Sequence, residues 1–231
     1  MARRVALRAR VRGRCHRLVP SQFPPIGVFD TVASADDALA AMVLEGLTND
    51  RLQLPLRRAQ LLPAPDWIVN EPGATAVMAA FLHAAPEGGR FSSGQLGAWY
   101  AARTRETAIS ETIHHQGRRL AASPTLAMVA SITMREWVHT LDATLVDLRG
   151  MEESRPELYD PDSYALSQPL GESQRSSGAT GIVYNSVRHR GGSCVVLYKP
   201  RAVLPLRQGV HLEYRWNGGN QPTVVLLEQL R

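Results

Sequence analysis

The sequence is poor in cysteine, lysine and long hydrophobic stretches. Its two cysteines, Cys15 and Cys194, lack the spacing of a metal site and are too few for a disulfide framework, which fits a reducing compartment. No run approaches the ~18 apolar residues of a membrane span. Arginines open the chain, but the apolar core of a signal peptide does not follow them. We therefore expect a cytoplasmic protein with no membrane partner.

Basic charge is carried almost entirely by arginine and is concentrated at the start of the chain. The 231 residues have a formal net charge of +5, and Lys199 is the single lysine among 26 basic residues. The plain interpretation of the basic start is a solvated tail or an edge strand, and the alternative is a surface for nucleic acid or an acidic partner. The arginines among the first 17 residues are Arg3, Arg4, Arg8, Arg10, Arg12, Arg14 and Arg17.

Helical patterns dominate the first half of the sequence. After an extended, proline-containing entry, a helix is predicted over residues 34–50 with Ser34 as its N-cap. Its predicted apolar face consists of Ala38, Met42, Leu44 and Leu47. Two more helices are predicted over residues 71–85 and 104–120, and a Pro-Glu-Gly-Gly breaker closes the first of them.

Short β-rich segments dominate the second half. The predicted strands are residues 126–134, 144–150, 181–184, 193–200, 210–216 and 222–230. A polar stretch over residues 152–180 is expected to hold one helix and a long surface loop. Helices followed by antiparallel strands favour a single α+β domain over a doubly wound one.

Familiar catalytic and metal-binding motifs are absent from the sequence. It contains no HExxH, CxxC, GxGxxG or Walker A pattern and no nucleophile elbow. The adjacent His114 and His115 project about 100° apart on a helix, which is poor geometry for joint metal binding. We expect no metal site.

Three polar or aromatic residues with suggestive chemistry remain. Arg90, Tyr100 and Glu111 could together bind a cationic, phosphate-bearing ligand, through an arginine fork, an aromatic face and a carboxylate. Taken one at a time, each fits a plainer role: a surface arginine, a core tyrosine and a solvated helix carboxylate.

The order of these pieces resembles the RES domain, a bacterial family named for an arginine, a glutamate and a serine. Many of its members are toxins of type II toxin-antitoxin modules. The matching pieces are Arg17 in "RLVPSQFPP", Gly89-Arg90-Phe91, Tyr100-Ala101-Ala102, Ala108-Ile109-Ser110-Glu111, and Gly181-Ile182-Val183-Tyr184-Asn185-Ser186-Val187-Arg188. The chain departs from the family where Phe91-Ser92-Ser93 replaces a usual Trp-Asn.

The resemblance implies a domain plan and a fold. It divides the chain into a basic segment, 1–14, and a RES domain, 15–231, with core motifs over about 15–200 and a C-terminal strand extension over 201–231. RES domains are similar to ADP-ribosyltransferases, so the expected fold is a split β-core with flanking helices.

The resemblance also implies NAD as the substrate. Glu111 would stabilise the oxocarbenium-like transition state as nicotinamide leaves, and Tyr100 would contact nicotinamide or its ribose. Arg17 and Arg90 would hold the pyrophosphate and ribose, Ser186 would hydrogen-bond the ligand, and Arg188 would add charge. These assignments place catalysis on Glu111, Arg90 and Tyr100.

The acceptor and the partners are implied less specifically. ADP-ribose transfer to a target protein is the first expectation, and release to water or phosphate, which depletes NAD, is the alternative. A cognate antitoxin is the expected partner, with an acidic segment or a terminal carboxylate at the arginine-lined site. A non-enzymatic nucleic-acid-binding protein is the competing class, although nucleic acid is not expected to bind the toxin itself.

Overall fold

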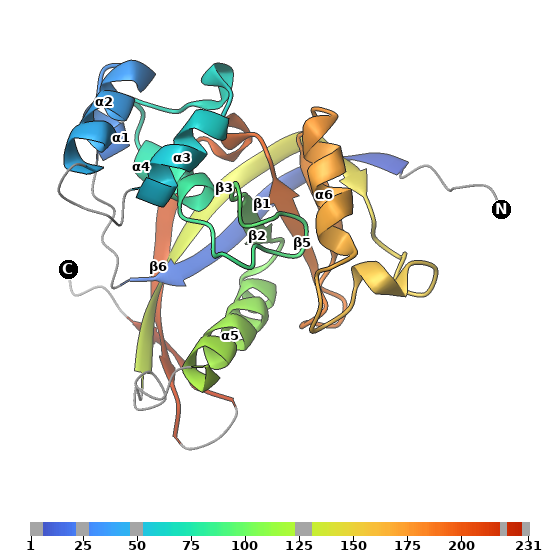
Figure 1. Ribbon diagram of the computed structural model, residues 1–231. Coiled ribbons are helices and arrows are strands. Elements are labelled where there is room, and N and C mark those ends of the chain that lie inside the picture. The colour runs from blue at the N-terminus through green and yellow to red at the C-terminus, as the bar shows by residue number, and fades with distance from the viewer. Residues whose placement is uncertain (1–6, 22–27, 47–52, 123–130, 218–220, 228–231) are drawn as a thin grey trace.

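Two long strands form the centre of the sheet in this structure. β1 (Leu7–Pro20) and β3 (Ser131–Asp147) pair antiparallel along the whole of β1, from Leu7 opposite Asp147 to Pro20 opposite Met134. Figure 1 shows the computed structural model, in which residues 7–21, 28–46, 53–122, 131–217 and 221–227 are described. The basic start is therefore largely part of the sheet, and the predicted boundary at residue 14 falls inside β1.

Five further strands complete a seven-stranded sheet. They are β2 (Trp99–Ala102), β4 (Gly181–Asn185), β5 (Ser193–Leu197), β6 (Leu206–Arg215) and β7 (Thr223–Leu227). The order is β1-β2-β5-β4-β3-β6-β7, and the extra β1–β3 pairing closes β1, β2, β5, β4 and β3 into a circuit. β3 divides the sheet, because residues 131–139 pair with β6 whereas Val146 and Asp147 pair with β4.

Helices lie against both faces of the sheet. They are α1 (Val28–Thr31), α2 (Ala35–Gly46), α3 (Gln53–Leu61), α4 (Ala74–Leu82), α5 (Arg105–Ala121) and α6 (Ser167–Ser176), with 3-10 turns at Ala64–Asp66, Pro156–Leu158 and Pro200–Val203. Figure 1 shows α1–α4 grouped together, apart from α5 and α6. The predicted α+β class with flanking helices is confirmed. None of the described helices is long and apolar enough to cross a membrane.

Alternation along the strands produces two hydrophobic cores. Trp99 and Ala101 on β2 belong to the core beneath α1–α4, whereas Ala98 and Ala102 belong to the core beneath α5. This is the period of two that puts successive side chains on opposite faces of a sheet. Tyr100 packs with the second core, so its side chain lies on the α5 face.

The N-cap predicted at Ser34 is confirmed, and Thr104, predicted as the first residue of a helix, is the N-cap of α5. The main-chain N–H of Asp37 donates to Ser34 Oγ at 3.1 Å at the start of α2, and Thr104 caps α5 by accepting from the N–H of Thr107 at 3.2 Å. Ala38 and Met42 are buried as predicted. Leu44 is 71% exposed, so its predicted place in the core is wrong, and Leu47 lies outside the described residues.

Two elements differ from the sequence prediction. The segments 126–134 and 144–150 were predicted as separate strands, but the described part forms the single strand β3. A charged residue, Glu136, interrupts the apolar pattern there and is nevertheless completely buried. Helix α3 was not among the predicted elements; its Pro55 lies in the first turn, where proline is tolerated.

The close approach of α6 to the turn around Arg90 requires a glycine. A Cβ at Gly171 would overlap the main-chain O of Phe91, whereas a Cβ at Gly117 in α5 has nothing within 4 Å. Gly171 therefore brings α6 against the segment that carries Arg90.

Replacing Gly171 by alanine is expected to lower the free energy of unfolding by about 1–3 kcal/mol, because α6 or the turn must move. Gly117→Ala is the matched control, and it should raise the free energy of unfolding by up to about 1 kcal/mol through helix propensity alone. Chemical denaturation measures both values. Equal effects of the two substitutions would contradict the close contact.

Candidate active site

The turn after β4 contacts the middle of α5 through a short hydrogen bond. Ser186 Oγ donates to Glu111 Oε1 at 2.6 Å. Ser186 Oγ also accepts from the main-chain N–H groups of Arg188 at 3.2 Å and His189 at 2.9 Å. The Ser186 proton is thus directed at the carboxylate. Two predicted site residues that are 75 positions apart in sequence are in direct contact.

A second contact holds this turn against α5. Thr107 Oγ1 and His189 Nδ1 are 2.8 Å apart, and a Cβ at Gly192 would come within 2.5 Å of Thr107 Oγ1. Thr107 and Glu111 are four residues apart, so they lie on the same face of the helix. The turn and the carboxylate therefore have a fixed relative position.

Arg90 is buried, so the surface position suggested by its residue type is wrong. It is 7% exposed, and its Nη1 donates to the main-chain O atoms of Leu158 at 3.0 Å and Asp160 at 2.8 Å. The guanidinium lies 4.9 Å from the centre of the Tyr164 ring. Within the described chain no hydrogen-bond partner is found for Nε and Nη2, the edge that arginine uses for bidentate anion binding.

Tyr100 packs against the same turn as Arg90. Its hydroxyl accepts from the main-chain N–H of Phe91 at 2.9 Å and is 2.9 Å from Ser92 Oγ. A Cβ at Gly89 would come 2.7 Å from the Tyr100 ring, so glycine is needed for this approach. Burial raises the pKa of Tyr100 to about 12, and the phenol is neutral at physiological pH.

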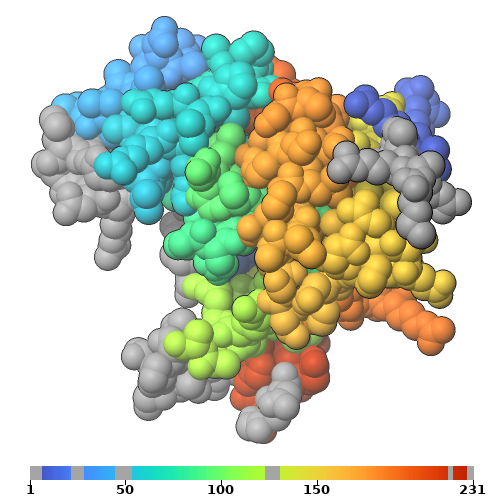
Figure 2. Space-filling model, turned by 45° about the vertical axis from the view of Figure 1, so that its right-hand side comes forward, coloured from blue at the N-terminus to red at the C-terminus, as the bar shows by residue number. Residues whose placement is uncertain are grey.

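Arg188 joins this region through the segment before α6. Its Nη2 donates to the main-chain O of Pro161, close in sequence to the two carbonyls that hold Arg90. The segment from Leu158 to Tyr164 therefore contacts both arginines. In Figure 2 this segment and α6, in yellow to orange, lie side by side on the surface.

Tyr184 and Cys194 connect the two halves of the cluster and were not predicted as site residues. They are directly opposite each other on β4 and β5, and Cys194 Sγ lies 3.8 Å from Glu111 Oε1. The Tyr184 ring packs edge-on against Phe91 with centroids 4.9 Å apart. Burial raises the pKa of both groups well above the ordinary value, so both are neutral. Tyr184 lies two residues before Ser186, a spacing at which the side chains of a strand share one face, and this was the signal that could have included Tyr184.

Arg17 lies elsewhere. It leaves β1 on the face of the Trp99 core, with its guanidinium 4.8 Å from the Trp99 ring centre, and Nη1 donates to the main-chain O of Tyr100 at 2.9 Å. Burial lowers the pKa of Arg17 to about 10, which still leaves it a cation. Arg17 supports the Tyr100 main chain from the opposite face, and this position does not suit the predicted direct contact with a ligand beside Glu111.

The remaining site residues combine a carboxylate with fixed positive charge. Glu111 is half-buried, and one of its oxygens is bound by Ser186 while Oε2 lacks a hydrogen-bond partner among the residues described. Arg90 and Arg188 supply charge on the same face of the sheet. This arrangement suits a ligand that carries both anionic groups and a developing cation.

The sequence pattern of the RES domain matches residues 55–217. The chain belongs to the RES-domain family. The matched region contains Arg90, Tyr100, Glu111, Ser186 and Arg188, and it begins after Arg17.

Two known proteins are similar to this RES protein along most of its length. Uncharacterized protein y4oC of Sinorhizobium fredii is 27% identical over 212 residues, which cover 90% of this chain and 85% of that protein. The crystal structure of the M. tuberculosis MbcT-MbcA toxin-antitoxin complex contains a chain that aligns with a TM-score of 0.49 and 13% identity, over 90% of this chain and 87% of that one.

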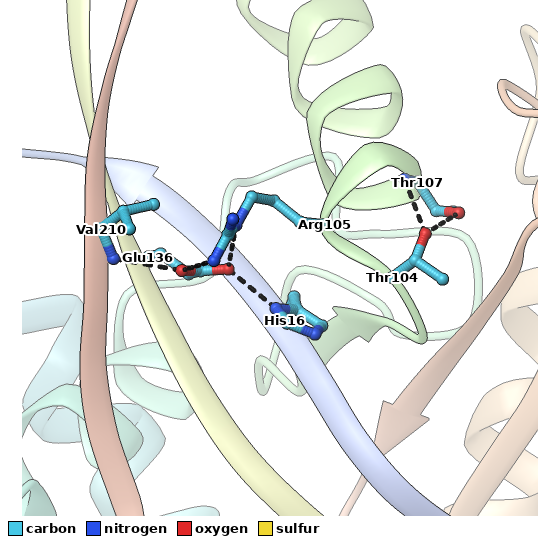
Figure 3. Close-up of polar contacts among 6 residues, drawn as sticks. All are labelled: His16, Thr104, Arg105, Thr107, Glu136 and Val210. Atoms are coloured by element: carbon cyan, nitrogen blue, oxygen red, sulfur yellow. Dashed lines mark hydrogen bonds and ion pairs between the residues drawn. The ribbon is translucent and has the colours of Figure 1, made fainter. Parts of the chain in front are cut away.

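A buried ion-pair cluster fixes the start of α5 in the RES domain (Figure 3). Glu136 is 0% exposed. Its carboxylate accepts from Arg105 Nε at 2.9 Å and Arg105 Nη2 at 3.0 Å. It also accepts from the main-chain N–H of Val210 at 3.1 Å and pairs with His16 Nδ1 at 2.7 Å. The cluster links β1, β3 and β6 to the helix that carries Glu111. Sequence reasoning missed it because its members are scattered.

Burial alone would raise the pKa of Glu136, but its hydrogen bonds from His16, Arg105 and Val210 outweigh burial and lower the pKa to about 2. The ordinary value is about 4.3. Between about pH 4.3 and about pH 2, Glu136 therefore binds a proton more readily in the unfolded chain than in the folded chain. The stabilisation from the ionised carboxylate is lost as the pH falls through this interval.

We expect the free energy of unfolding to fall by about 3 kcal/mol on acidification from about pH 5 to pH 2 because of this one group. The Glu136→Gln variant should lack this component, and urea denaturation at a series of pH values measures both proteins. Parallel curves for the wild type and the variant would show that Glu136 does not titrate this way.

Proposed function

We propose that this RES protein is the toxin of a toxin-antitoxin module that breaks the bond between nicotinamide and ribose in NAD and transfers the ADP-ribosyl group. Family membership and the charge arrangement support the proposal. The observation that carries it is the hydrogen bond from Ser186 to Glu111 at 2.6 Å, which joins two separate family motifs into one site.

Glu111 provides electrostatic stabilisation in this reaction. The carbon–nitrogen bond breaks with its electron pair on nicotinamide, which leaves as a neutral molecule, and positive charge develops on the ribose. Since Ser186 orients one carboxylate oxygen, the other oxygen can face this charge without reorganisation. The neutral Tyr184 and Cys194 beside it add no competing charge.

Arg90 and Arg188 bind the pyrophosphate. Two carbonyls hold Nη1 of Arg90, so its Nε–Nη2 edge is preorganised for a phosphate fork. Arg188 adds a second charge beside it, and Tyr100 offers its ring to nicotinamide or the ribose, since its hydroxyl is already hydrogen-bonded within the protein. The protein requires no metal for these steps.

The protein partner proposed here is an antitoxin, and the acceptor is a side chain of a target protein in the cytoplasm. The MbcT-MbcA structure is of a toxin-antitoxin complex, and an analogous partner would neutralise this chain. Exposed arginines favour an acidic segment in that partner. Release of ADP-ribose to water or phosphate, with depletion of NAD, is the alternative outcome of the same bond cleavage.

The Glu111→Gln variant is expected to lose NAD cleavage by at least ~10²-fold while it stays folded, because the charge that stabilises the transition state is gone. The matched control is Glu106→Gln, an exposed carboxylate in the first turn of the same helix. Nicotinamide release is the readout. Wild-type turnover by folded Glu111→Gln would overturn the catalytic role.

Transfer to protein is expected to leave the label of adenine-labelled NAD on a macromolecule. Incubation with cell lysate and inorganic phosphate separates the routes: label in the protein fraction supports the transferase, free ADP-ribose indicates hydrolysis, and a phosphorylated ADP-ribose indicates phosphorolysis. Either of the last two products without labelled protein would replace the transferase with an NAD-degrading enzyme.

A further inference from the structure

Four arginines form a row on the outer surface of β1. Arg8, Arg10, Arg12 and Arg14 alternate with residues that face the other way, so their side chains share one face of the strand, and all four are exposed. On the opposite face Val11 and Cys15 are buried in the core. The arginine row is therefore held on a rigid strand and is not part of a solvated tail.

Within the described residues, the positive charge of the arginine row is only partly neutralised. The residues opposite it on β3 are Val146, Thr144, Asp142 and Thr140. Asp142 is the one carboxylate among these four, and Arg8 and Arg14 have no ion-pair partner within the described chain.

Asp142 shows how the arginine row holds a carboxylate. Arg10 donates two parallel hydrogen bonds to the Asp142 carboxylate, from Nε to Oδ1 at 2.7 Å and from Nη2 to Oδ2 at 3.0 Å. Arg12 Nε donates to the same Oδ1 at 3.2 Å. This acidic side chain comes from the strand on one side of β1. A strand on the other side could present acidic side chains to the arginine row in the same way.

On the other side of β1, residues 7–11 have no neighbouring strand among the residues that the structure describes. β2 pairs with β1 at His16, and Arg103 donates to the main-chain O atoms of Gly13 and Arg12. Within the described residues no strand pairs with this edge of residues 7–11. An edge strand of this kind presents unpaired main-chain groups to an incoming strand. Figure 1 shows that this end of β1 lies at the margin of the sheet, near α6.

We propose that the edge of residues 7–11 and the arginine row bind an extended, acidic peptide segment of a partner protein, which adds to the sheet as a strand. Acidic residues at alternate positions of the segment repeat every ~6.6–6.8 Å, the spacing of Arg8 and Arg10. The open edge favours a peptide over a nucleic acid, because a phosphate backbone does not use main-chain pairing. This surface is distinct from the Glu111 site and does not depend on NAD chemistry.

The probes are a fluorescent seven-residue peptide of alternating Thr and Glu, a block peptide of the same composition, and a single-stranded RNA of twenty nucleotides. The full-length protein is expected to bind the alternating peptide most tightly by fluorescence anisotropy, and methylation of the peptide's main-chain nitrogens should weaken binding. Equal binding of the alternating and block peptides would overturn strand addition. Tighter binding of RNA, or no saturable binding of the alternating peptide at low salt, would overturn the proposal.

Matched variants locate the surface. The double variant Arg8→Gln, Arg10→Gln should weaken peptide binding about tenfold, through the loss of two exposed ion pairs. Arg207→Gln, an exposed arginine on β6, should leave binding unchanged. Asp142→Asn removes the internal competitor for Arg10 and Arg12 and should strengthen binding several-fold. NAD cleavage should be unaffected in the double variant, and equal peptide binding by the double variant and the wild type would contradict the assignment.

Discussion

The continuous pairing of β1 with β3 is the constraint on which the rest of the fold depends. It places His16 beside Glu136, and Glu136 takes both nitrogens of the Arg105 fork at the start of α5. A buried carboxylate without these partners would be costly, so the strand and the helix can only come together in this arrangement. Glu111 is six residues further along α5, so its position depends on the ion pair that anchors the start of the same helix.

The site depends equally on a few close approaches of main chain. The Tyr100 ring packs against Gly89, and the Phe91 carbonyl packs against Gly171, at distances that leave no room for a Cβ atom. These contacts orient the short turn that carries Arg90, whose guanidinium is then held by two carbonyls. The long, charged side chain of Arg90 therefore has one orientation, because the groups that hold it are main-chain carbonyls in fixed positions.

Local signals made part of this predictable from the sequence. The cap at Ser34 and the continuous apolar run "GIVY" depend on neighbours in the chain, and they gave the right elements. Contacts between distant segments were less accessible. The continuity of β3 was hidden because Glu136 is polar in sequence and neutralised only by Arg105, which is 31 positions away. Arg17 has a residue type suited to binding phosphate, but its side chain lies on the Trp99 face of the sheet, away from Glu111. The face on which a strand residue lies depends on the pairing register of the strand, which the sequence does not show directly.

The Ser186 hydroxyl has no spare hydrogen-bonding capacity. A hydroxyl offers one proton and two lone pairs, and Ser186 gives the proton to Glu111 while its oxygen accepts from two main-chain N–H groups. Such an oxygen is a poor nucleophile, because attack would require it to break contacts that also hold the turn. In this structure the Ser186 hydroxyl therefore holds the turn after β4 against Glu111, and the predicted hydrogen bond from Ser186 to a ligand would have to replace one of these contacts.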